Sequence, residues 1–336
     1  MVTISTPVRN ARAHKTTLRI GVVVILALAV AAMMFDGAQS QTLKTIKLVV
    51  PNPPGGVSDL LARLVADEIG RKQGQTFLIE TRPGAAGDIG SEAVSRAAPD
   101  GETVLINANP LVINANLRRL NFDPLADLVP ICQLVRAPTA LAVNAASPYR
   151  TLNDLLDSAR LRPGGLTLAS IGPGSATHVA FEALKRAARV EMTFVPYAGT
   201  APAVNALLGE HVTSYLGNYA DVREQTAASK LRVLATASAM RTELLHDVPT
   251  IAESGFPSVH IEVWFGIFAP GKTPDETQTR LATMFSTALR SAELKSKLLL
   301  QGLYPSGVCG AEFRNFVRSQ YEDYGRLIRE TGFPRE

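Results

Sequence analysis

From residue 46 onward, the chain alternates short apolar segments rich in β-branched residues with longer segments of helical period. Residues 46–51 (IKLVVP) have the composition of a buried strand. Residues 58–70 place their larger aliphatic side chains on one side of a helix, which Ser58 can cap and Gly70 can end. The pattern predicts an α/β architecture built on parallel strands.

The same unit of strand, loop and helix recurs along the chain. Residues 274–336 are predicted to be helical almost throughout, with Pro274 at the first helical position. No low-complexity linker and no solenoid-type repeat interrupts the pattern. Further strands are predicted at 77–81, 103–106, 166–170, 192–197, 231–235 and 264–270, and further helices after the loops at 82–87 and 172–174, from Thr200, and over 221–227.

Four loops rich in glycine, serine and threonine each open a helix directly after a strand, at 52–57, 82–87, 172–175 and 198–200. The first N–H groups of a helix lack partners within that helix and lie at the positive end of its dipole, so such loops suit an anion. In an open α/β sheet they gather at the carboxyl ends of the strands. We therefore expect two loops from each of two lobes to close on one carboxylate ligand.

A second interpretation of these loops stays open. Strand-to-helix connections commonly use glycine to turn and serine or threonine to cap, without binding any ligand. Asp59 already has a sufficient role in favouring the dipole of its helix. A histidine in the position of His178 is more often a capping or core residue than a ligand contact.

Composition and charge narrow the class of protein. The 336 residues are 46% hydrophobic, so the chain can bury sizeable cores and two lobes are plausible. Four basic residues against one acid in residues 1–40 account for most of the formal charge of +4. The rest of the chain is close to neutral and lacks a block of lysine and arginine, which argues against a nucleic-acid partner.

The N-terminal region has the pattern of a secretory signal peptide. Positive charge precedes an uncharged apolar run at 20–35, and small residues follow at 38–40 with the spacing of a cleavage site. We expect a signal peptide over 1–40, a mature chain from about Gln41 and a periplasmic location. An uncleaved anchor is the alternative, and no cysteine follows the run to carry a lipid.

The two cysteines, Cys132 and Cys309, lie in the mature region, where an oxidising compartment permits a bridge. Their positions in the sequence do not show that their Cα atoms are close enough. Two buried or half-buried thiols are favoured over a disulfide. The histidines lie far apart and none has a zinc-ligand context, so neither a metal nor a cofactor is expected.

Enzymatic motifs are absent from the loops. Residues 84–90 do not form G-x-G-x-x-G, residues 172–176 do not form G-x-S-x-G, and no phosphate-binding G-x-x-x-x-G-K-[ST] occurs. Ser175 and His178 could serve as nucleophile and base, but they share one helical turn and no third group orients the histidine. We expect no catalysis, and a secreted hydrolase is the least favoured alternative.

Taken together, several segments resemble the Bug family, the solute-binding receptors of tripartite tricarboxylate transporters, which are type II periplasmic binding proteins. They follow the family order over essentially the whole mature chain. The segments are PNPPGGVSDLLAR at 51–63, TRPGAAGDIG at 81–90, PDGETVL at 99–105, IGPGSATHVAFEAL at 171–184, VPYAGTAPAVNALLGEHV at 195–212, LATASAMR at 234–241, DVPTIAESGFP at 247–257 and GIFAPGKTPDE at 266–276.

The resemblance implies two α/β lobes, each a mixed, mostly parallel sheet flanked by helices, joined by two crossing strands. Lobe 1 would comprise 41–142 plus 263–336 and lobe 2 would comprise 143–262, with the ligand held between them through backbone amides, hydroxyls and water. The ligand-binding residues that it implies are Pro54, Gly55, Gly56, Val57, Asp59, Ala85, Ala86, Asn109, Gly172, Ser175, Ala176, Thr177, His178, Tyr197, Gly199, Thr200, Asn218 and Asp221.

The resemblance also implies a small organic acid as ligand, membrane permease subunits as partners and a monomeric receptor. A ligand-dependent sensor or orphan receptor needs the same cleft and stays open as an alternative. The chain departs from the family pattern at Thr81, at Ala198, where a lysine is usual, and at Ser229. The segment 217–221 departs as well, so Asn218 and Asp221 are transferred from a weaker match.

Overall fold

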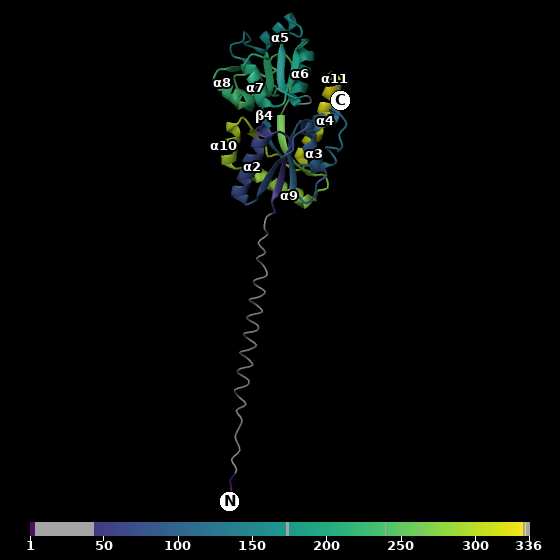
Figure 1. Cartoon of the computed structure of the whole chain (residues 1–336), viewed down its shortest axis with the longest axis vertical. Helices are drawn as coiled ribbons and strands as arrows, with labels where there is room; N and C mark the ends of the chain where they lie inside the picture. The colour runs from purple at the N-terminus through teal and green to yellow at the C-terminus, as the bar shows by residue number, and fades with distance from the viewer. Residues whose placement is uncertain (4–43, 173–174, 239, 262, 332, 334–336) are drawn as a thin grey trace. The chain divides into compact units, whose positions relative to one another are not determined.

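The computed structural model describes residues 1–3, 44–172, 175–238, 240–261, 263–331 and 333 (Figure 1). The chain divides into a first unit, residues 1–43, and a second unit, residues 44–336. All helices and strands discussed below belong to the second unit. Apart from residues 1–3, the predicted signal peptide lies outside the described residues. Among the described residues, no helix is both long and apolar enough to cross a membrane.

The first sheet has six strands in the order β11-β4-β10-β3-β1-β2. The strand β1 pairs in parallel with β2 and β3, whereas β10 is antiparallel to β3 and β4, and β11 is antiparallel to β4. The strands are β1 (Ile46–Val50), β2 (Phe77–Thr81), β3 (Thr103–Ala108), β4 (Leu128–Ala137), β10 (Val263–Pro270) and β11 (Tyr304–Pro305).

The second sheet has five strands in the order β7-β6-β8-β5-β9. The strand β6 pairs in parallel with β7 and β8, and β5 is antiparallel to β8 and β9. Both sheets are therefore mixed, with the parallel pairs on one side of each sheet. The strands are β5 (Thr139–Asn144), β6 (Thr167–Ile171), β7 (Thr193–Tyr197), β8 (Ser214–Asn218) and β9 (Leu231–Ala235).

Helices connect the parallel strands and cover both sheets (Figure 1). Those interleaved with the strands of the first sheet are α2 (Val57–Gln73), η1 (Ala85–Gly87), α3 (Asp88–Ser95), α4 (Pro110–Leu117), α9 (Asp275–Leu289), α10 (Ala292–Leu300) and α11 (Ala311–Thr331). Those interleaved with the strands of the second sheet are α5 (Leu152–Leu161), α6 (Ala176–Ala188), α7 (Thr200–Leu208), α8 (Tyr219–Ala227) and η2 (Glu243–Leu245).

Two segments join the sheets. The strand β4 leads through Pro138 directly into β5, and residues 236–262 return the chain from β9 to β10. The first residue of β10, Val263, pairs with Ala137 at the end of β4, so the chain leaves and re-enters the first sheet at neighbouring positions. The limits predicted for the lobes, 41–142 plus 263–336 and 143–262, stay a prediction.

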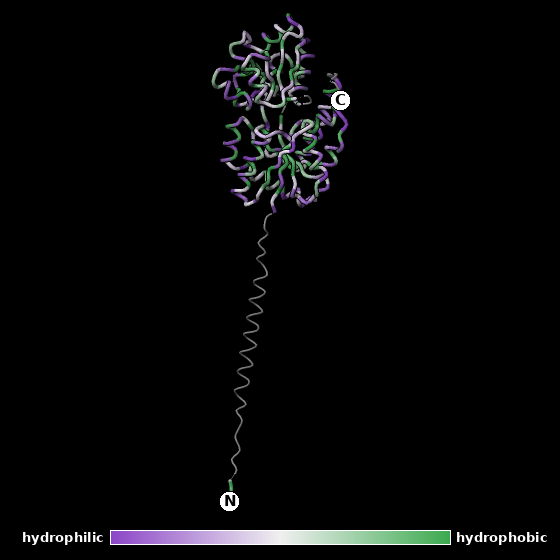
Figure 2. Tube along the Cα trace, viewed as in Figure 1, coloured by the Kyte–Doolittle hydropathy of each residue, from purple (hydrophilic) through white to green (hydrophobic). Residues whose placement is uncertain are grey.

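The core of the first sheet is centred on β10, whose residues are all buried. The indole of Trp264 is fully buried and meets the ring of Phe313 edge-on, with 5.8 Å between ring centroids. Gly266 faces the same ring, and a Cβ atom there would overlap Phe313, so the strand needs glycine at this position. Figure 2 shows the hydrophobic positions along the strands, with the hydrophilic ones toward the ends and outer helices.

Cys132 and Cys309 form a disulfide, with 4.0 Å between their Cα atoms. The prediction of two unpaired thiols is therefore wrong. The reason is a pairing of β4 with residues 307–309, in which Gln133 donates its N–H to the Val308 carbonyl at 2.7 Å and Gly307 donates back to Gln133 at 3.1 Å. Because 177 residues separate the cysteines, this proximity has no local signal in the sequence.

The disulfide closes a long loop, so breaking it should destabilise the fold. We expect Cys309→Ser to lower the free energy of unfolding by about 2–4 kcal/mol, because the unfolded chain gains conformational freedom. Urea unfolding without reductant measures the change, and reduced wild-type protein is the control. Thiol titration of the unfolded, unreduced wild type should find no free thiol. Two free thiols in that sample would contradict the pairing.

Candidate functional site

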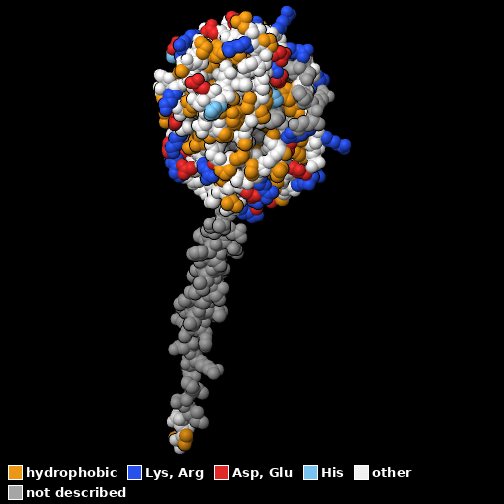
Figure 3. All heavy atoms as spheres, turned by 45° about the horizontal axis from the view of Figure 1, so that its top comes forward, with side chains coloured by type: hydrophobic (Ala, Val, Ile, Leu, Met, Phe, Trp, Pro, Cys, Tyr) orange, Lys and Arg blue, Asp and Glu red, His pale blue; other side chains and the backbone are white. Residues whose placement is uncertain are grey.

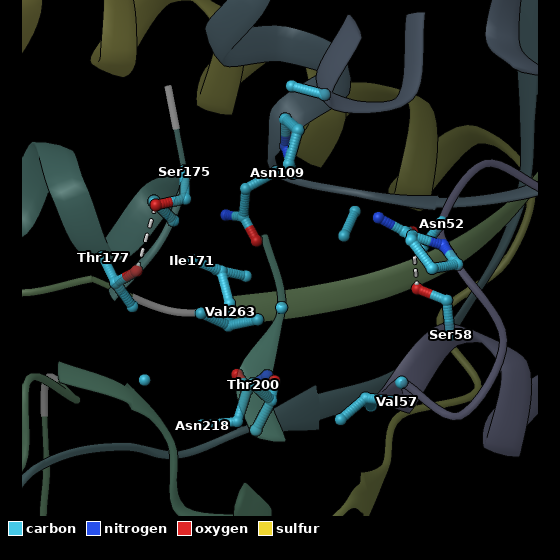
Figure 4. A pocket seen from close by; sticks show the side chains of 18 of the residues that line it. Asn52, Val57, Ser58, Asn109, Ile171, Ser175, Thr177, Thr200, Asn218 and Val263 are labelled. Carbon is cyan, nitrogen blue, oxygen red and sulfur yellow. Dashed lines mark hydrogen bonds between the residues drawn. The ribbon is translucent and has the colours of Figure 1, made fainter. Parts of the chain in front are cut away.

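A cavity of about 330 Å³ lies between residues of the two sheets (Figure 4). Its walls come from the segments that follow β1, β2, β3, β6 and β7, from the ends of β3, β6 and β8, and from the start of β10. Most of these are the carboxyl ends of parallel strands, where ligands bind in open α/β sheets. The lining residues are Asn52, Pro53, Pro54, Gly55, Gly56, Val57, Ser58, Ala86, Asn107, Ala108, Asn109, Pro110, Ile171, Ser175, Ala176, Thr177, Ala198, Gly199, Thr200, Ala201, Pro202, Gly217, Asn218, Val263 and Phe265.

None of the described residues that line the cavity has an ionisable side chain. Its polar groups are amides, hydroxyls and backbone atoms, and its apolar walls include Ile171, Val263 and Phe265. A charged ligand would therefore be held by neutral dipoles. The outer surface, unlike the cavity lining, carries many charged groups: lysine, arginine and acidic side chains are interspersed on the face shown in Figure 3.

Several helices begin at the cavity wall. The N-caps of α2, α6, α7 and α8 are Gly56, Ser175, Gly199 and Asn218, and all four line the cavity. No side chain caps α2 or α7, so their first N–H groups are open to a ligand. Because helix N-termini carry partial positive charge, this arrangement attracts an anion without any cationic side chain.

The lining residues that belong to the first sheet and its loops form the first wall of the cavity, and those of the second sheet form the second wall. The first wall is held in place by Asp59, which is buried and does not line the cavity. Its Oδ2 accepts the Gly55 N–H at 3.1 Å and the Arg63 Nε–H at 3.2 Å, while Arg63 Nη2 lies 3.0 Å from Oδ1. Burial opposes ionisation, but the hydrogen bonds from Arg63 and Gly55 outweigh it and keep the pKa of Asp59 below its usual range. Asp59 thus fixes the conformation of the loop 52–57 without lining the cavity itself.

The loop before α3 has a strained backbone at the cavity. Ala85 and Ala86 both have positive φ, 47° and 52°, which costs non-glycine residues about 1 kcal/mol or more each. Ala86 lines the cavity and Ala85 does not. The Ala85 carbonyl accepts a hydrogen bond from Arg118 at 2.8 Å, which helps to hold the strained turn.

Two asparagines of the first wall have fixed side chains. Asn52 Oδ1 accepts the Ser58 hydroxyl at 3.0 Å, and its side-chain nitrogen points toward the middle of the cavity in Figure 4. Asn109 Oδ1 accepts the Trp264 N–H at 3.1 Å, and its Nδ2 donates to the Tyr324 hydroxyl at 2.9 Å. Asn109 therefore lines the cavity and also ties α4 to β10 and α11.

On the second wall, hydroxyl groups form a short chain. Thr177 Oγ1 lies 2.6 Å from Ser170 Oγ and 3.1 Å from Ser175 Oγ. Ser175 Oγ accepts the backbone N–H of His178 and donates to the Gly172 carbonyl, both at 3.2 Å. Ser175 and Thr177 line the cavity, whereas Gly172 does not.

The His178 ring points away from the cavity. It stacks on Phe194 with 3.7 Å between ring centroids and meets Phe333 edge-on at 4.6 Å. Burial, assisted by the positive charge of Lys185, lowers the pKa of His178 to about 4. Ser175 bonds to the backbone of His178 and not to its ring, so the two residues form no nucleophile and base pair.

The structure thus brings together most of the predicted site residues. Tyr197 and Asp221 lie outside the cavity lining, as do Asp59, Ala85, Gly172 and His178. The Tyr197 carbonyl accepts the Gly172 N–H at 3.1 Å, which joins β7 to the loop after β6. The predicted residues that line the cavity are Pro54, Gly55, Gly56, Val57, Ala86, Asn109, Ser175, Ala176, Thr177, Gly199, Thr200 and Asn218.

The family model described as "Tripartite tricarboxylate transporter family receptor" matches residues 61–333. The chain belongs to this receptor family. It is 30% identical over 298 residues to the protein BugT of Bordetella pertussis, a match that covers 88% of this chain and 91% of BugT. The predicted relation to the Bug family is confirmed.

Two solved structures from Rhodopseudomonas palustris show the same fold. Rpa4515 with adipate is 31% identical, with a TM-score of 0.82, and the match covers 88% of this chain and 100% of that one. MatC with bound malate is 26% identical, with a TM-score of 0.77, and the match covers 85% and 99%. The two-lobed α/β fold is confirmed. As a member of the tripartite tricarboxylate transporter receptor family, the chain is a solute-binding protein and not an enzyme.

Other lining residues escaped prediction. Asn52 lies in the predicted loop 52–57 and Ser58 follows it directly, but neither was expected to contact the ligand. Only their mutual hydrogen bond in the structure distinguishes them from ordinary loop and cap residues. Asn107, Val263 and Phe265 join the cavity only because β10 returns beside β3. The remaining unpredicted ones are Pro53, Ala108, Pro110, Ile171, Ala198, Ala201, Pro202 and Gly217.

The buried, unprotonated His178 should make stability depend on pH. The unfolded chain binds a proton near the ordinary pKa of 6.5, whereas the native state does so only at about 4, so stability is lost as pH falls between these values. From about pH 7.5 to about pH 5, we expect wild type to lose about 1–2 kcal/mol more unfolding free energy than His178→Phe. Urea unfolding at both pH values measures this. An exposed-histidine variant, His211→Gln, should behave as wild type, and an equal loss in His178→Phe would contradict the prediction.

Proposed function

We propose that this receptor captures a small carboxylate-bearing metabolite in the cavity between its lobes and delivers it to the membrane subunits of a tripartite tricarboxylate transporter. The observation that carries the proposal is a cavity whose described lining residues have no ionisable side chain and onto which the N-termini of α2, α6, α7 and α8 converge. Neutral walls with helix ends favour an anion of small size over a cation.

The dimensions and the walls fit such a ligand. A volume of about 330 Å³ lies at the small end of the range for ligand pockets. Helix N-termini occur on both walls, and apolar side chains such as Val263 and Phe265 lie among them. A carboxylate would lie at the helix ends, and its carbon chain would contact the apolar surface. The relatives bound to adipate and malate support this class of ligand.

The proposed contacts follow from what each lining group can donate. The backbone N–H groups of Val57 and Ser58 at the start of α2, and of Thr200 and Ala201 at the start of α7, would hold carboxylate oxygens. The side-chain amide of Asn52 would add a further hydrogen bond. Asp59 and His178 would act only by supporting the walls.

A periplasmic location forms part of the proposal. The charged and apolar pattern of residues 1–40 supports export, and the disulfide between Cys132 and Cys309 suits an oxidising compartment. An anion-binding receptor in the periplasm would present its ligand to the membrane subunits of the transporter.

A ligand screen tests the proposed function. We expect adipate, malate or a related acid to raise the thermal midpoint of residues 41–336, with about 2.7 kcal/mol of added stability at a hundredfold excess over Kd. The matching diamides, which keep the carbon chain but lose the charge, should give no shift. Equal shifts with an acid and its diamide would argue against carboxylate recognition.

A substitution at the start of α2 tests the place of the carboxylate. The nearest atom to a Cβ at Gly56 is the Pro53 carbonyl oxygen at 3.9 Å, and φ is −85°, so a side chain fits there. We expect Gly56→Asp to weaken binding of the acid about tenfold or more, because its carboxylate repels that of the ligand. Gly56→Asn has the same shape without the charge, and both residues favour an N-cap. Titration calorimetry should find a much smaller loss for Asn, and equal affinities in the two variants would place the carboxylate elsewhere.

A further inference from the structure

One carboxyl group lies directly behind the second wall of the cavity. Asp221 is the third residue of α8, and its Oδ2 accepts the N–H of Asn218 at 3.1 Å and the hydroxyl of Tyr215 at 2.8 Å. Thr200, the first residue of α7, lines the cavity beside Asn218, and α7 packs against α8. Because Asn218 also lines the cavity, the N-terminus of α8 is linked directly to the Asp221 carboxyl group.

The position of Tyr215 is fixed by its surroundings. Its ring is fully buried, and a Cβ atom at Gly217 would overlap its hydroxyl, so a glycine is required beside it. Gly217 itself lines the cavity. The tyrosine therefore holds the half-buried Asp221 carboxyl close to the wall.

No cation pairs with Asp221 within the part of the chain that the structure describes. The elements packed against α8 are α7, β5, β8 and β9. Their ionisable side chains are Tyr215 and Arg232, and Arg232 donates to the Tyr149 and Ala145 carbonyls beyond the far end of β5. On α8 itself, Arg223 and Glu224 follow Asp221. Burial of its carboxyl group raises the pKa of Asp221 to about 6, although hydrogen bonds from Tyr215, Asn218 and Thr200 act against this rise.

We propose that Asp221 is a positioning residue that couples the capture of an anion in the cavity to the uptake of a proton, and that it acts through Asn218 and the N-terminus of α8. This inference rests on the proposed function of the cavity as an anion site. The proton comes from solvent and joins the Asp221 carboxylate, and no other bond is made or broken.

Two effects give the coupling the same sign. The negative charge of an ionised Asp221 offsets the partial positive charge at the start of α8, which would otherwise attract an anion. The same charge also repels an anion at the neighbouring helix ends. Each effect makes the anion bind more tightly when Asp221 is protonated.

The direction of the pH dependence follows from these effects. A bound anion raises the pKa of Asp221 above its value in the empty receptor, so binding takes up protons between the two values. Affinity for the anion should therefore rise as pH falls from above neutrality toward about 6 and level off below that pKa. A receptor without this group would show only the titration of the ligand itself.

Isothermal titration calorimetry with adipate tests the inference on residues 41–336. Kd is measured from about pH 5.5 to about pH 8 for wild type and Asp221→Asn, so that the titration of adipate is common to both proteins. We expect the ratio of wild-type Kd to variant Kd to rise about three- to tenfold over this range, which corresponds to a pKa difference of about half to one unit. Titrations in two buffers of different ionisation enthalpy should show more proton uptake by wild type.

Two further variants separate this role from a structural one. Asp154 is the third residue of α5 and caps it as Asp221 caps α8, but it is exposed and lies outside the cavity. Asp154→Asn should therefore keep the wild-type pH profile. Tyr215→Phe removes a donor that lowers the pKa of Asp221, so its pH transition should move upward.

The outcomes distinguish the two proposals. Identical pH profiles and proton uptake in wild type and Asp221→Asn, with adipate bound by both, would overturn this inference and leave the proposed function intact. If neither adipate nor malate binds the wild type at any pH, both proposals are overturned. A changed profile in Asp154→Asn equal to that of Asp221→Asn would assign the effect to helix capping and overturn the role of Asp221.

Discussion

The parallel strand pair is the constraint on which this receptor depends. Two parallel neighbours need a crossover connection, and the helix that provides it begins at the carboxyl end of the first strand. The pairs β1 with β2 and β6 with β7 therefore leave the N-termini of α2 and α6 at the same kind of edge, where the first N–H groups lack partners within their own helix. The connections that make the sheets thus also supply the anion-binding dipoles, and the cavity needs no cationic side chain.

Part of the fold could be predicted because its signals are local. Residues 77–81 and 231–235 match β2 and β9, since each is a short apolar run bounded by polar or turn residues. The strands β4 and β5 were not predicted, because they are buried on both faces and show no alternation, and Pro130 and Pro138 interrupt the run. The disulfide was missed for a related reason, since only the pairing of β4 with residues 307–309 brings Cys132 and Cys309 together.

The candidate site divides in the same way. Backbone loops such as Gly55–Val57 were predicted because glycine and capping residues mark them in the sequence. Asp59 and His178 lie in the first turns of α2 and α6. The Asp59 carboxylate pairs with Arg63 and the His178 ring stacks on Phe194, so neither side chain lines the cavity. Side-chain direction depends on tertiary packing, so local patterns did not reveal it. Val263 and Phe265 reach the cavity only through the return of β10, which is a property of the whole topology.

Each wall is backed by one aspartate carboxyl group, and the two differ in their partners. Asp59 and Asp221 are both third residues of helices that begin at the cavity. Arg63 pairs with the buried Asp59, and the pKa of that carboxyl lies below its usual range, so it stays ionised near neutral pH. Among the described residues, the half-buried Asp221 has only neutral hydrogen-bond donors, and desolvation moves its titration toward neutrality. The electrostatic potential in a cavity lined by neutral groups can therefore still change with pH. The charge of Asp221 acts on the ligand through protein of low dielectric constant and not through water.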